Sequence, residues 1–257
     1  MFRFTARAVA VATCVLLSGP GHAGEIYTDK SRGYSIEIPD RWVSVSPNVV
    51  TQINHAIALF VKQNVSYQAC FVPAGHTSAE LPRILVQFQP WDGEIPTYDV
   101  LEKTLKRDMP AAVNKVKKDT GAPLRSLEVG DVALDRKANR ITMRMQASVP
   151  GDGMVQGLSI GMVGKDGIVF FHCYARAERF ARTVPLFEVF ADSFRFEPGR
   201  SFDESVATLT SESGRSGGRS SMFSWMGGFR RGTIGALIGG GIGLIAMAAR
   251  RWRRRPA

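Results

Sequence analysis

Residues 232–249, near the C-terminal end, form an apolar segment without a charged side chain, and five arginines follow it between Arg250 and Arg255. As a helix, these residues would extend about 27 Å at about 1.5 Å per residue, close to the hydrocarbon thickness of a bilayer. A surface helix of a soluble protein would instead alternate apolar and polar positions. The segment is therefore predicted to be a transmembrane helix, and residues 250–257 a basic cytoplasmic tail.

The first residues, 1–23, have the pattern of a secretory signal peptide. Arg3 and Arg7 precede an apolar run, and small residues then lead to Ala23. This order predicts export and cleavage after Ala23, with an uncleaved signal anchor as the alternative. Because more arginines follow the transmembrane segment than precede it, the positive-inside rule places the tail in the cytoplasm. We expect a single-pass protein of the cell inner membrane, with residues 24–198 as a periplasmic or extracellular α/β domain.

The net charge of +10 is concentrated at the two ends of the chain. Residues 24–198 contain 21 Lys and Arg against 20 Asp and Glu, whereas residues 199–257 contain ten Arg against three acids. The domain is therefore nearly neutral, and we expect no nucleic-acid partner, because nucleic-acid binding needs a basic surface. Residues 199–231 begin with a stretch rich in Gly and Ser and are predicted to be a flexible linker.

Residues 24–198 show strand-like alternation interrupted by helix-like segments. Ser46-Pro47 is typical of a helix start, and four strand-like runs after residue 126 are separated by short polar turns. Strands are expected at 34–38, 65–72, 83–89, 127–134, 140–149, 154–163 and 168–175, and helices at 47–61, 97–120 and 183–192. The predicted fold class is α+β, an antiparallel β-sheet meander flanked by helices.

Two motifs at the ends of this domain carry a family resemblance. They are Gly33-Tyr-Ser-Ile-Glu-Ile-Pro-Asp-Arg-Trp42 and Pro185-Leu-Phe-Glu-Val-Phe-Ala-Asp-Ser-Phe-Arg-Phe196. With the meander between them, residues 26–197 resemble the PsbP-like α/β/α sandwich superfamily. The resemblance implies a non-enzymatic binding or assembly module and carries over no catalytic residue, since these are packing motifs.

Removal of the signal peptide would leave two cysteines, Cys70 and Cys173. In an oxidising compartment such a pair is a candidate for a disulfide, which would close a loop of about 100 residues. The alternative is two buried, reduced thiols, because both residues lie in apolar strand-like runs. The sequence leaves both possibilities open.

Three histidines remain as candidates for chemistry, His55, His76 and His172. None has a partner at metal-binding helical spacing, and His172 and Cys173 would point to opposite faces of one strand. His172 is expected to be a core histidine, and no third group accompanies a possible Cys70–His76 pair. No catalytic residue, metal ligand or cofactor is therefore predicted. Trp91 is expected to fold back on the core, with a partner contact as the alternative.

Gly235, Gly239 and Gly243 recur every four residues in the predicted transmembrane helix, so they share one face. Such a face lets another helix approach closely, although glycine is also common in membrane helices in general. We expect the membrane as one partner, and either a protein partner or self-association through this face.

Together these features indicate a membrane-anchored extracytoplasmic binding or assembly module without enzymatic activity. Two alternatives are a membrane-tethered enzyme of unknown reaction and an oligomeric membrane scaffold that works through the glycine face of its anchor.

Overall fold

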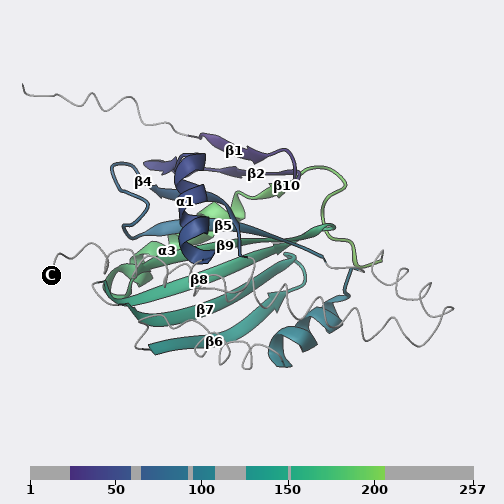
Figure 1. The fold of residues 1–257 in the computed structure, drawn as a ribbon. Coiled ribbons are helices and arrows are strands. Elements are labelled where there is room, and N and C mark those ends of the chain that lie inside the picture. The colour runs from purple at the N-terminus through teal and green to yellow at the C-terminus, as the bar shows by residue number, and fades with distance from the viewer. Residues whose placement is uncertain (1–23, 59–64, 92–94, 108–125, 150–151, 206–257) are drawn as a thin grey trace, which may run out of the picture.

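The computed structural model describes residues 24–58, 65–91, 95–107, 126–149 and 152–205, which form two antiparallel sheets and several helices (Figure 1). The helices are α1 (Pro47–Ala58), residues 98–107, and α3 (Ala177–Asp192). The large sheet has the order β3 (Trp42–Ser44), β4 (Tyr67–Pro73), β5 (Arg83–Pro90), β9 (Gly167–Arg176), β8 (Gly153–Val163), β7 (Arg140–Val149), β6 (Ser126–Asp135). The small sheet has the order β1 (Ile26–Asp29), β2 (Tyr34–Glu37), β10 (Arg195–Phe196).

Strands β6 to β9 form the predicted antiparallel meander, in which each strand pairs with the next. The large sheet is completed by the pairing of β9 with β5. This pairing places His172 opposite Leu85, although the two residues are 87 positions apart in the sequence. The predicted α+β class with a large antiparallel sheet is confirmed.

Helices and the small sheet cover the large sheet on both sides (Figure 1). Side chains of a strand alternate between its two faces. We call the side that bears Leu85 and His172 the α1 face, because α1 and residues 98–107 pack there through Ile53 and Leu101. The other side, the α3 face, is covered by α3 and the small sheet, with Phe187 and Tyr34 in its core. The domain thus has two apolar cores, one on each side of a shared sheet.

Three features differ from the sequence prediction. The small sheet was not expected, because its strands are only two to four residues long. Helix α3 begins at Ala177 rather than near residue 183, and Pro185 lies inside it. Residues 199–205, assigned to the linker, belong to the folded part, since Ser201 bridges to Gly164 and Phe202 is buried. Phe202 stacks on Tyr98 with ring centroids 4.8 Å apart, so packing extends the domain beyond residue 198.

Several predictions fall outside the described residues. These are the signal peptide 1–23, the linker after residue 205, the transmembrane segment 232–249 with its three glycines, and the tail 250–257. Within the described part of the chain, no helix combines the length and the apolar character needed to cross a membrane.

Candidate functional site

A buried polar network lies on the α1 face, where three strands bring Gln87, Ser159 and His172 together. Ser159 pairs with His172 across β8 and β9, and its Oγ lies 2.9 Å from His172 Nδ1. His172 Nε2 lies 3.1 Å from Gln87 Oε1 on β5. Because an amide oxygen only accepts, Nε2 carries the proton and donates to Gln87, and the Ser159 hydroxyl donates to Nδ1.

The surroundings of His172 keep its ring neutral. The residue is fully buried between the rings of Tyr67 and Phe170. Burial lowers the pKa of His172 to about 3, because the imidazolium form would lose its hydration. The prediction of a core histidine with satisfied hydrogen bonds is confirmed.

A serine beside a histidine is a possible nucleophile and base, but this pair is enclosed. Ser159, His172 and Gln87 expose 2% of their surface or less. Gln87 has no charge with which to stabilise an imidazolium, and Ser159 lies in the middle of a strand. In this conformation a substrate cannot reach the pair, and its hydrogen bonds serve to satisfy polar groups in the core.

Glycines make room for the aromatic row that contains His172. Gly157 pairs with Tyr174 and Gly161 with Phe170, on either side of the Ser159–His172 pair. A Cβ atom on Gly161 would lie 2.6 Å from Cε1 of Phe170. These glycines therefore allow rings of β9 to lie over β8, which is a packing role.

The two cysteines lie on opposite faces of the large sheet, which favours the alternative of two buried, reduced thiols over a disulfide. Cys70 pairs with Leu85 and faces the α1 side, whereas Cys173 pairs with Ile84 and faces the α3 side. Their strands flank β5 and so are about 10 Å apart, beyond the roughly 7 Å limit between bonded Cα atoms. Both thiols are free and buried. Burial raises the pKa of Cys70 to about 11 and also raises that of Cys173, so neither is a thiolate at neutral pH.

The other candidates from the sequence do not assemble into a site. His55 is exposed on α1, and His76 is exposed in the turn after β4. Trp91 packs against the α1-face core and donates from Nε1 to the carbonyl of Gly164 at 3.0 Å, as expected for a residue folded back on the core. Among the described residues, no three His, Cys, Asp or Glu side chains are grouped to hold a metal ion.

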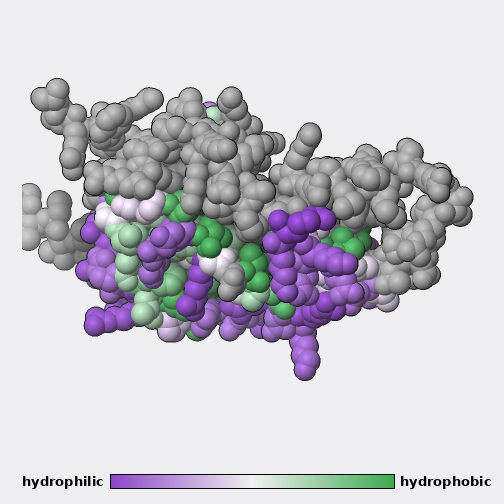
Figure 2. Space-filling view, turned by 90° about the horizontal axis from the view of Figure 1, so that it is seen from below, coloured by the Kyte–Doolittle hydropathy of each residue, from purple (hydrophilic) through white to green (hydrophobic). Residues whose placement is uncertain are grey.

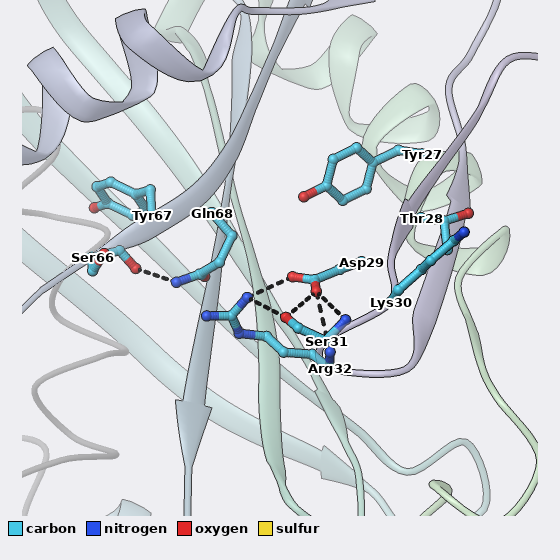
Figure 3. Close-up of a pocket in the computed structure, with 9 residues that line it drawn as sticks. All are labelled: Tyr27, Thr28, Asp29, Lys30, Ser31, Arg32, Ser66, Tyr67 and Gln68. Atoms are coloured by element: carbon cyan, nitrogen blue, oxygen red, sulfur yellow. Dashed lines mark hydrogen bonds and ion pairs between the residues drawn. The ribbon is translucent and has the colours of Figure 1, made fainter.

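One open hollow lies between the β1–β2 hairpin and the start of β4 (Figure 3). Within it, Asp29 accepts from Ser31 Oγ at 2.6 Å and pairs with Arg32 at 2.7 Å. Arg32 also lies over the ring of Phe88, 5.5 Å from its centroid. Burial opposes ionisation of Asp29, but the hydrogen bonds from Ser31 and Arg32 and the charge of Arg32 outweigh it and lower the pKa of Asp29. Since Asp29 is already bonded to Ser31 and Arg32, these contacts are best explained as stabilising the turn between β1 and β2.

A second hollow, which we call the α3 groove, lies between α3 and the α3 face of β6–β8, with a volume of about 580 Å³. Its apolar wall comes from α3, and its floor combines Gln, Glu and Arg side chains with small residues. It is lined by Glu128, Val129, Gly130, Arg144, Met145, Gln146, Gln156, Gly157, Phe180, Ala181 and Val184. Seen from the side of β6, the visible surface mixes hydrophobic and hydrophilic residues (Figure 2).

The sequence did not point to either the buried network or the α3 groove. Gln87 and His172 are separated by 85 positions, and the groove joins a helix to strand residues that lie 23 to 56 positions earlier. One local signal was available, namely the polar residues Arg144 and Gln146 at alternate positions of β7, opposite its buried face.

Neither a protein-family model nor a curated protein matches this sequence. Solved structures do match. The solution structure of cyanobacterial PsbP (CyanoP) from Synechocystis sp. PCC 6803 has 16% identity and a TM-score of 0.42, covering 69% of this chain and 95% of that one. The Ran-binding protein Mog1p of Saccharomyces cerevisiae has 10% identity and a TM-score of 0.39, covering 67% and 95%. These matches to PsbP-like structures are similarities of fold, and they assign neither ligand nor partner.

Proposed function

We propose that this chain is a membrane-anchored extracytoplasmic binding module. The observation that carries the proposal is the contrast between the buried polar network and the α3 groove. The Ser159–His172 pair is enclosed in the core, whereas the α3 groove is open and offers both apolar and polar groups. A concave site of several hundred cubic ångströms with a few convergent polar groups is typical of ligand recognition.

The proposed location rests on the ends of the sequence. The signal-like residues 1–23, the apolar segment 232–249 and the arginines after it support export of the domain and retention by one anchor. Binding by a tethered domain also benefits from a high local concentration at the membrane.

The location is tested with reporter fusions in the full chain. A reporter that is active only outside the cytoplasm should give signal when fused after Ser205 and none when fused after Ala257. The opposite pattern would refute the proposed topology.

The binding role is tested by crosslinking in intact cells. A photoreactive residue at Ala181, which lines the groove, should give a discrete adduct that can be identified. The same residue at Arg182, exposed on α3 but outside the groove, is the control. Equal labelling at both positions, or none at either, would contradict a binding role for this groove.

A further inference from the structure

We infer that the α3 groove binds an extended peptide segment in which an apolar side chain lies close to a carboxylate. This inference rests on the proposed function and names the chemistry of the partner.

The wall of the groove is an apolar contact surface provided by α3. Phe180 is buried at its base, Val184 is half-buried and Ala181 is exposed. The small side chain of Ala181 leaves space beside the two larger ones. An apolar side chain of a partner would remove this surface from water, which is favourable at about 25 cal/mol per Å².

Arg144 supplies the charge that the partner would complement. It projects from β7 on the exposed side of the strand and, among the described residues that line the groove, is the one basic residue. Arg144 makes no ion pair with any residue in the described part of the chain, whereas Arg140, four positions before it on β7, pairs with Asp192 at 2.8 Å. An arginine beside an apolar wall is well placed to bind a carboxylate, because its guanidinium offers several donors in a plane.

The rest of the floor favours a peptide over a simple acyl chain. Gln146 and Gln156 form a cross-strand pair at 3.0 Å, and each amide keeps further donor and acceptor capacity. Glu128, on β6, pairs with Gln146 of β7. Its ionised carboxylate accepts hydrogen bonds but donates none. A peptide presents N–H and C=O groups to all three, whereas an acyl chain would desolvate them without replacing their hydrogen bonds. The groove thus presents acceptors for N–H groups, one cation for a carboxylate and an apolar wall.

The test measures binding of fluorescein-labelled octapeptides to the full-length protein in detergent micelles by fluorescence anisotropy. The peptides carry one leucine and one glutamate at varied separation, and a matched set replaces glutamate by glutamine. We expect the glutamate peptides to bind about tenfold more tightly, as for a hydrogen bond to a charged group. Arg144→Gln should remove this preference, while Arg182→Gln on the exposed side of α3 should keep it.

Three results with the peptides alone would overturn the inference. They are no binding of either peptide set, equal binding of both sets to the unmodified protein, and loss of the preference in Arg182→Gln as well as in Arg144→Gln. Displacement of the peptides by equimolar laurate would assign the groove to an acyl carboxylate, which also contradicts it. The reporter fusions and the Ala181 adduct do not depend on this measurement, so failure here leaves the proposed function to be judged by them.

Discussion

Replacement of His172 by glutamine is expected to weaken the dependence of stability on pH. The folded state holds the His172 pKa at about 3 against the usual 6.5, so between these values the unfolded chain binds more protons. Stability from the neutral imidazole is therefore fully present above about pH 6.5 and is lost as the pH falls toward 3. The whole difference corresponds to about 5 kcal/mol, since one pKa unit is about 1.4 kcal/mol.

The measurement is urea unfolding of residues 24–205 at several values between about pH 7 and pH 4. At about pH 5 the unmodified domain should have lost roughly 2 kcal/mol more than His172→Gln, each relative to its own stability at neutral pH. Glutamine keeps a donor and an acceptor for Ser159 and Gln87 but cannot take up a proton. Carboxylates titrate in both proteins, so the difference between them isolates His172.

A second measurement tests the same explanation. In NMR spectra of the unmodified domain, the ring protons of His172 should not titrate between about pH 7 and pH 5. Equal pH dependence in the His172→Gln domain and its parent, or a His172 titration near pH 6.5, would show that the residue is not held neutral by burial.

Three other predictions concern packing, thiols and the anchor. Gly161→Ala should lower the free energy of unfolding by about 1–3 kcal/mol, because its Cβ would meet the buried Phe170 ring. Gly130→Ala, where the nearest such contact is 3.5 Å, should change it far less, and equal losses in urea unfolding would contradict this packing role. In unreduced protein freed of its signal peptide, alkylation followed by mass spectrometry should find both cysteines modified when the chain is unfolded and neither modified when it is folded. Two cysteines that stay unmodified in the unfolded, unreduced chain would instead indicate a disulfide. Gly239→Leu should weaken association of residues 229–255 in a membrane-helix assay more than Ala236→Leu does. Equal effects would mean that the three glycines form no helix-packing face.

Local patterns predicted the parts of this domain that depend on local physics. Alternation identified β7, because one of its faces is buried and side chains alternate at a period of two, whereas β9 is buried on both faces and is a continuous apolar run in the sequence. Ser46-Pro47 located the start of α1, where Pro47 is the first helical residue and Ser46 accepts from the amide of Val50. The short strands β1 and β10 carried no comparable pattern, and they exist because β2 pairs with both.

The candidate site shows the limit of such reasoning. His172 was predicted to lie in the core, but its partners Ser159 and Gln87 depend on which strands lie beside β9. The same holds for Cys70 and Cys173, whose separation follows from two strand pairings and from the face to which each residue points.

By itself, the sequence determined the strand periodicity, the class of fold and the apolar and basic segments that predict export and anchoring. Only the tertiary structure decided that the thiols lie apart, that Ser159 and His172 are enclosed, and that α3 forms a groove with Arg144. The reason is physical. Burial and alternation act between near neighbours in the chain, whereas the order of strands is chosen by packing among residues far apart in it, and many orders satisfy the same local pattern.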